Sequence, residues 1–182
     1  MARLIYGMMQ SLDGYIEGTG HGPGLPMPSE SLHQHFNDKV RGLSGIIYGR
    51  RMYEVMAYWD EDHPGAEAVE EDFASAWREK QKWVASRTLK ELGPNASLLD
   101  ADIGAAVRHL KAKVEGTLEV AGPEIAAALS SLGLIDEYQL YLMPVVLGGG
   151  KPFFGVGARP KLELIDTEVL DQGVVLARYR AV

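Results

Sequence analysis

Two clusters of basic and hydroxyl side chains follow short apolar runs that are typical of buried strands. The first cluster comes after residues 44–48 and the second after residues 82–85. A glycine that admits a ligand closely, free amides at a helix start and paired guanidinium groups form a good anion site. Solvated surface arginines are the alternative, but two basic strand ends in an acidic protein favour one ligand with phosphates in two places. The clusters consist of Gly49, Arg50, Arg51 and Met52, and of Ser86, Arg87 and Thr88.

A third strand end runs directly into a helix and could present backbone amides to a pyrophosphate. Val120 is the last residue of the predicted strand, and two small residues and a proline lead from it into the helix. A tight structural turn would use the same residues. The chain has no G-x-G-x-x-G fingerprint, so the sequence does not predict a Rossmann dinucleotide site. The residues at this strand end are Ala121, Gly122, Pro123, Glu124 and Ile125.

Asp13 and Gly14 follow the first predicted strand and have two explanations. In a simple turn, the Asp13 carboxylate bonds to nearby backbone amides. The segment 18–28 is rich in Gly and Pro, and a mobile loop beside a strand end is typical of a lid. This proximity favours a functional site slightly over the turn.

The glycine run 148–150 precedes Lys151 and superficially matches a phosphate loop. Pro152 stands where a Walker motif has Ser or Thr, and no helix is predicted after the strand. We therefore interpret this run as a flexible bend between two long antiparallel strands.

The residue types give little support for a metal site or for a nucleophilic catalytic residue. The chain has no cysteine, which removes thiolate zinc sites, disulfides and cysteine nucleophiles. His33 and His35 are two residues apart and so lie on different faces of a helix. His63 stands in an acidic segment, for which a solvated loop is the stronger interpretation. We predict no metal site.

Hydrophobic periodicity, with Gly and Pro as punctuation, predicts alternating strands and helices. Ser29 or Ser31 is the expected N-cap of the first helix, and Asp102 that of a later one. A short helical turn is expected from Gly49 and an acidic loop at 58–64. The predicted strands are 4–9, 44–48, 82–85, 117–120, 135–147, 161–170 and 174–179, and the predicted helices are 29–42, 66–80, 102–114 and 123–132.

This order predicts one three-layer α/β domain over residues 1–182, with a mostly parallel central sheet and antiparallel strands at the C-terminal end. Asp171, Gln172 and Gly173 suit a hairpin between the last two strands. Ligands of such sheets bind beyond the carboxyl ends of the strands. The strand-end clusters above are therefore expected to meet at one edge of the sheet.

Composition excludes several classes of protein. The 182 residues carry a formal net charge of −7, which argues against a nucleic-acid binder. A hydrophobic fraction of 46% with 24% charged residues is ordinary for a globular protein. No apolar run approaches the roughly 20 residues that cross a bilayer. The N-terminus has no signal-peptide pattern, so we expect a cytoplasmic protein.

Five motifs, taken in order, resemble the dihydrofolate reductase superfamily. They are most similar to the C-terminal reductase domain of the bifunctional riboflavin-biosynthesis deaminase/reductase. The resemblance covers nearly the whole chain and, with no deaminase domain in front, implies a stand-alone reductase. The motifs are SLDGYI at 11–16, GRRMYE at 49–54, SRTL at 86–89, GLIDEY at 133–138 and PVVLGGGKPFF at 144–154.

The resemblance implies a three-layer α/β/α domain that binds NADPH and transfers hydride to a ring or ribosyl-imine carbon. It places Gly49 to Met52 at the pyrophosphate, Ser86 to Thr88 around the adenosine 2′-phosphate, and Ala121 to Ile125 at the other phosphate edge. It also places Met9, Ile16 and Glu17 near the nicotinamide. Asp13 falls at the substrate side, where it would orient the substrate or relay a proton. The family association further implies a homodimer.

The resemblance leaves the acceptor open. A dihydrofolate reductase carries an acidic residue on its first helix, whereas the stretch 31–36 has none and Glu30 and Asp38 only flank it. The expected activity is therefore that of a 5-amino-6-(5-phosphoribosylamino)uracil reductase acting on a ribosyl-imine or related carbonyl. The alternatives are a dihydrofolate or pterin reductase, and a catalytically inactive NADPH-binding protein of the same fold.

Overall fold

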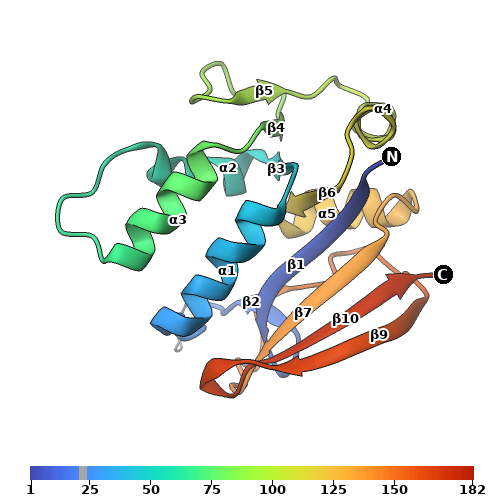
Figure 1. Cartoon of the computed structure of the whole chain (residues 1–182). Coiled ribbons are helices and arrows are strands. Elements are labelled where there is room, and N and C mark those ends of the chain that lie inside the picture. Colours follow the sequence, from blue (N-terminus) through green and yellow to red (C-terminus); the bar gives the residue numbers. More distant parts are fainter. Residues whose placement is uncertain (21–23) are drawn as a thin grey trace.

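A twisted eight-stranded sheet runs through the centre of the molecule (Figure 1), within residues 1–20 and 24–182 that the computed structural model describes. Its spatial order is β5-β4-β3-β6-β1-β7-β10-β9. The strands are β1 (Arg3–Ser11), β3 (Gly45–Gly49), β4 (Lys82–Ala85), β5 (Ala96–Leu98), β6 (Thr117–Ala121), β7 (Glu137–Met143), β9 (Leu162–Val169) and β10 (Val175–Ala181).

The strand directions confirm the predicted mixed sheet. From β5 across to β7 all neighbours are parallel, whereas β10 is antiparallel to both β7 and β9. The carboxyl ends of β1, β3, β4 and β6 therefore lie at the same edge. The predicted hairpin between β9 and β10 is also confirmed, with left-handed backbone at Gln172 (φ 57°) and Gly173 (φ 70°).

Helices cover both faces of the sheet and complete the predicted three layers (Figure 1). Val40 of the first helix and Trp77 pack against one face, while Val107 and Ile125 pack against the other. The first face carries α1 (Glu30–Gly42), α2 (Arg50–Met56), the 3-10 turn η1 (Ala57–Asp60) and α3 (Ala68–Arg78), and the second carries α4 (Ile103–Lys113) and α5 (Pro123–Ser131).

The predicted caps begin their helices as expected. The Ser29 hydroxyl accepts a hydrogen bond from the Leu32 amide at the start of α1. The Asp102 carboxylate accepts one from the Ala105 amide at the start of α4. These side chains satisfy amides that have no partner within the helix.

Asp136 joins the first strand to the second half of the chain. Its carboxylate accepts hydrogen bonds from the Leu4 amide at 2.7 Å and from the Lys111 ammonium at 2.6 Å. Its own amide donates to the Leu4 carbonyl at 2.9 Å. The GLIDEY motif thus fixes β1 and β7 side by side and attaches α4 to them.

The glycine run does not have the role that the sequence predicts. Its predicted strand of 135–147 ends at Met143, and β7 is not a neighbour of β9. The run leads instead into β8 (Lys151–Pro152), which pairs with β2 (Tyr15–Glu17). A Cβ on Gly150 would lie 1.9 Å from the Glu17 carbonyl oxygen, so only glycine allows this close approach.

Three short strands, β2, β5 and β8, were not predicted, because segments of two or three residues have no measurable periodicity. The predicted mobile loop 18–28 includes residues 21–23, which lie outside the described residues. The rest of that loop contains neither helix nor strand. Among the described residues, no helix has the length and apolar character needed to span a membrane.

Candidate active site

An open cleft of about 730 Å³ lies beyond the carboxyl ends of β3 and β6; we call it the main cleft. The helices α2 and α5, which follow these two strands, form its walls, and β2 and β8 reach it from the other side. Its lining consists of Glu17, Gly49, Arg50, Arg51, Met52, Val55, Ala85, Ile103, Gly122, Pro123, Glu124, Ile125, Ala128 and Lys151.

The backbone comes close to the main cleft at the end of β6. Gly122 has φ of 114° and is the N-cap of α5, without a side-chain cap. A Cβ there would lie 3.4 Å from the Met52 Cβ, so a larger residue would both strain the backbone and crowd α2. Uncapped first-turn amides at a helix start favour a bound anion.

Three cationic side chains and two carboxylates, those of Glu17 and Glu124, line the main cleft. The Glu124 carboxylate accepts from the Arg51 guanidinium at 3.2 Å and from the Lys151 ammonium at 3.3 Å. Arg50 lies 3.9 Å from Glu54 on the same helix. The side chains of Arg51 and Glu124 are 73% and 68% exposed, so an incoming anion can reach them. Exposed pairs of this kind are weak and easily exchanged.

A smaller pocket of about 240 Å³ adjoins the main cleft and includes Ser86 and Arg87. The two cavities share Ala85, the last residue of β4, and Ile103, the first of α4. The Ser86 hydroxyl accepts hydrogen bonds from the Thr88 amide at 3.2 Å and the Leu89 amide at 2.9 Å. This turn directs the chain away from β4 and leaves Arg87 exposed.

An apolar cavity of about 280 Å³ meets the main cleft at Met52, which lines both. It lies between α1, the sheet and the α2–α3 side of the molecule. Met9, Phe36 and Trp59 are among its walls. Aromatic and thioether groups of this kind suit a flat ring.

An ion pair contributes the charged part of the apolar cavity. The Lys39 ammonium donates to the Glu119 carboxylate at 2.5 Å, and the two side chains are 15% and 10% exposed. Burial alone would lower the pKa of Lys39, but the Glu119 carboxylate outweighs it and raises the pKa. Lys39 therefore keeps its positive charge inside the cavity wall, beside Glu119.

Asp13 lies outside these three cavities, in the turn between β1 and β2. Its carboxylate accepts from the Leu147 amide at 3.1 Å and the Gly148 amide at 2.7 Å. Hydrogen bonds from the Ser11 hydroxyl and then from these amides lower the pKa of the Asp13 carboxyl. The side chain fixes the segment that brings Lys151 to the main cleft.

A family model of the RibD C-terminal domain matches residues 2–176. The chain belongs to the RibD C-terminal domain family. A relative in Bacillus subtilis (strain 168), the uncharacterized protein YyaP, is 31% identical over 181 residues, which are 97% of this chain and 94% of the relative. The similarity thus extends over the entire fold, and the family is that of a riboflavin-pathway reductase domain.

Two solved structures place this RibD C-terminal domain among known folds. The first is a Shewanella sp. PV-4 protein whose name suggests riboflavin biosynthesis, with a TM-score of 0.76, 24% identity and coverage of 100% of this chain and 99% of the other. The second is dihydrofolate reductase from Enterococcus faecalis in complex with NADP(H), with a TM-score of 0.63, 15% identity and coverage of 98% and 96%. The predicted dihydrofolate-reductase-like fold is confirmed.

The RibD C-terminal domain brings most of the predicted cofactor residues together. Residues 49–52, 122–125 and Glu17 line the main cleft, Ser86 and Arg87 the adjoining pocket, and Met9 and Ala121 the apolar cavity. Three predicted site residues line none of these cavities, and they are Asp13, Ile16 and Thr88. Ile16 packs against the core instead.

In the main cleft and the apolar cavity, sequence reasoning missed four charged or imidazole side chains, namely His33, Lys39, Glu119 and Lys151. The glycine run was a usable signal for Lys151, because a run of glycines often marks a close backbone approach. The other three lie inside a helix or a strand and carry no local signal. Among the described residues, no group of three or more potential metal ligands comes together.

Proposed function

We propose that this protein is an NADPH-dependent reductase that transfers hydride to a ring, imine or carbonyl carbon of a small heterocyclic acceptor. The observation that carries the proposal is the series of three joined cavities along one edge of the sheet. Arg87 lies at one end of the series, in a pocket that also contains Asp100. Arg50, Arg51 and Lys151 lie in the main cleft, and the apolar cavity around Met9 lies at the other end. A dinucleotide has this same succession of phosphates and a flat ring.

The residues present fit the cofactor. Arg87 and the Ser86 hydroxyl would hold the adenosine 2′-phosphate in the adjoining pocket. Arg51, Lys151 and the first-turn amides of α5 would hold the pyrophosphate in the main cleft. Gly122 leaves the space that a pyrophosphate needs near the backbone. NADPH supplies the hydride, and the chain supplies its position.

The apolar cavity would hold the nicotinamide and the acceptor ring against one another. Met9, Phe36 and Trp59 would pack against the bound rings and so displace water from the reacting carbon, which would strengthen polar contacts to the acceptor. Correct placement of the two rings can supply a large part of the rate enhancement. Asp13 would act on turnover by holding the segment 147–148, which leads to Lys151 in the main cleft.

The acceptor that family membership supports best is 5-amino-6-(5-phosphoribosylamino)uracil or a related ribosyl-imine. Dihydrofolate remains the second candidate, because the fold neighbour that holds NADP(H) is a dihydrofolate reductase. The third is binding of NADPH without reduction.

The proposal is tested by offering the purified full chain NADPH together with each acceptor in turn. The panel contains the phosphoribosylaminouracil and its dephosphorylated form, dihydrofolate and an aromatic aldehyde. We expect loss of the reduced-nicotinamide absorbance with one acceptor, and transfer of deuterium from labelled NADPH to its carbon. Saturable NADPH binding with no reduction would favour the inactive binding protein, and no binding would contradict the proposal.

A further inference from the structure

The apolar cavity contains a histidine to which the proposed reaction gives no role so far. His33 stands on α1 and lines the cavity near Trp59 and Phe73. Its ring meets the Phe73 ring edge-on, with 5.5 Å between centroids and 86° between planes. The ring is partly buried, so packing against α3 limits its rotation.

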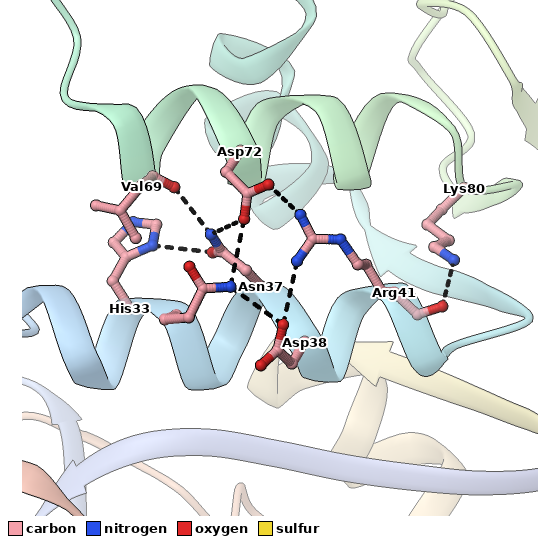
Figure 2. A network of polar contacts seen from close by, with 8 residues as sticks. His33, Asn37, Asp38, Arg41, Val69, Asp72 and Lys80 are labelled. Atoms are coloured by element: carbon pink, nitrogen blue, oxygen red, sulfur yellow. Dashed lines mark hydrogen bonds and ion pairs between the residues drawn. The ribbon is translucent and has the colours of Figure 1, made fainter.

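A buried asparagine fixes which nitrogen of His33 carries a proton (Figure 2). The Asn37 side-chain amide group donates to the Val69 carbonyl at 2.9 Å and to the Asp72 carboxylate at 2.8 Å. Both partners are pure acceptors, so the amide cannot be turned around. Its oxygen therefore faces His33 Nδ1 at 3.0 Å and can only accept. Nδ1 must carry the hydrogen.

The asparagine is itself held by a network between α1 and α3 (Figure 2). The Arg41 guanidinium donates to Asp72 and also, at 3.1 Å, to Asp38. The Lys80 ammonium donates to the Arg41 carbonyl at 2.7 Å. Hydrogen bonds from Asn37 and Arg41 lower the pKa of Asp72, which keeps it an acceptor. A chain of hydrogen bonds thus runs from Arg41 through Asp72 and Asn37 to His33.

This arrangement leaves Nε2 as the nitrogen of His33 that is available to a ligand. Within the described part of the chain, the hydrogen bond of this ring is the one at Nδ1. The charged groups that share the cavity with His33 are Lys39 on α1 and Glu119 on β6, and Asp72 lies behind Asn37 on α3. Lys39 and Glu119 are already paired with each other.

The other candidate proton donors are less suitable. The lowered pKa of Asp13 leaves a carboxylate without a proton at neutral pH, and its side chain lies outside the cavity. The raised pKa of Lys39 keeps its proton on the ammonium group. We propose that His33 is a catalytic residue whose imidazolium form donates the Nε2 proton to the acceptor heteroatom while Asn37 positions the ring.

The step balances and rests on the proposed reductase function. Hydride from the reduced nicotinamide forms a carbon–hydrogen bond at the acceptor carbon, and the carbon–nitrogen or carbon–oxygen π bond breaks. Its electron pair moves to the heteroatom, which takes the proton from the His33 imidazolium. The neutral imidazole, with Nδ1 still protonated, regains a proton at Nε2 from water.

The kinetic test compares His33→Gln with His35→Gln. His35 is a matched control because it lies two residues away on α1, outside the cavity, and contacts the Tyr141 hydroxyl at 3.3 Å. With whichever acceptor of the panel the wild type reduces, His33→Gln should lower turnover about a hundredfold or more. Its NADPH affinity should stay within about twofold, and its rate should no longer depend on protonation of an imidazole. His35→Gln should retain the wild-type rate and pH profile.

The tautomer is tested without an acceptor, in the full chain labelled with ¹⁵N-histidine. Long-range proton–nitrogen spectra should show neutral His33 with its hydrogen on Nδ1, and Asn37→Leu should give the Nε2–H form. An Nε2–H tautomer in the wild type would overturn the proposal, and so would wild-type turnover by His33→Gln. Failure of the reductase function would differ from both, because the wild type would then oxidise NADPH with no acceptor of the panel, whether or not it binds the nucleotide.

Discussion

The guanidinium of Arg87 is exposed at the end of β4, in the pocket that continues the main cleft. Only NADPH carries the 2′-phosphate that this group can hold in a charge-assisted contact. Arg87→Ala should weaken NADPH binding by roughly ten- to a hundredfold and NADH binding by less than about twofold. Titrations with both nucleotides measure this, with the exposed Arg108→Ala on α4 as the control. An unchanged preference for NADPH would show that the phosphate lies elsewhere.

Asp13 acts, in our account, through the segment that it holds. Asp13→Ala removes the acceptor of the Leu147 and Gly148 amides and so loosens the approach of Lys151 and the neighbouring β2 strand. A displacement of about 1 Å at a reacting centre can cost on the order of a hundredfold in rate. We expect turnover to fall by about that factor while NADPH affinity changes little. Equal losses in turnover and affinity would contradict this role.

At the residue scale, the sequence predicted best where residue type and local context coincide. The adjacent apolar runs 44–48 and 82–85 indicate strands, and a strand end could therefore be predicted for Arg50, Arg51 and Arg87, which follow these runs closely. The Lys39–Glu119 pair joins residues that are 80 positions apart, on a helix and on a strand. Neither local sequence contains any sign of the other. The orientation of His33 likewise depends on α3, which local sequence does not describe.

At the scale of elements, the start of α5 is where two other elements meet. Its Glu124 carboxylate forms ion pairs with Arg51 of α2 and Lys151 of β8. A pyrophosphate would contact these same two cations. A carboxylate at this point competes with and repels an incoming phosphate. Glu124→Gln should therefore strengthen NADPH binding by a few-fold at low salt, and the gain should shrink at high salt as exposed charges are screened.

Glu115→Gln, at an exposed position two residues before β6 begins, is the control for the general change in net charge. Binding isotherms at two ionic strengths separate the two effects. Weaker binding by Glu124→Gln would show instead that the carboxylate contacts the ligand favourably, through a ribose hydroxyl for example.

Helices with a capping residue and clear hydrophobic periodicity could be predicted from the sequence. Short strands that form only by pairing with a distant segment of the chain could not. Ser29 and Asp102 identify the starts of α1 and α4 from side-chain chemistry alone. The β2–β8 pair exists because Gly150 allows the Glu17 carbonyl to approach, and that contact crosses most of the chain. The prediction of a bend between antiparallel strands failed for this reason.

At the scale of the whole molecule, the strand β9 is the outer edge of the sheet (Figure 1). Several of its apolar side chains are exposed. Leu164 and Ile165 are 53% and 48% exposed, and Val169 is 76% exposed. Open edge strands with apolar side chains are rarely left uncovered. We predict a homodimer through this edge, with twice the 19.9 kDa mass of the chain in light scattering. Ile165→Lys with Val169→Lys should give monomers, and a monomeric wild type would contradict the prediction.

We propose that one dinucleotide lies across the ends of β4, β3 and β6. Trp59 lies in the wall of the apolar cavity and reports on a nearby nicotinamide by energy transfer. The most direct measurement is a fluorescence titration of the full chain with NADPH and NADH in parallel. We predict saturable binding of both, with NADPH at least about tenfold tighter because of its 2′-phosphate. No saturable binding, or equal affinity for the two nucleotides, would contradict the account.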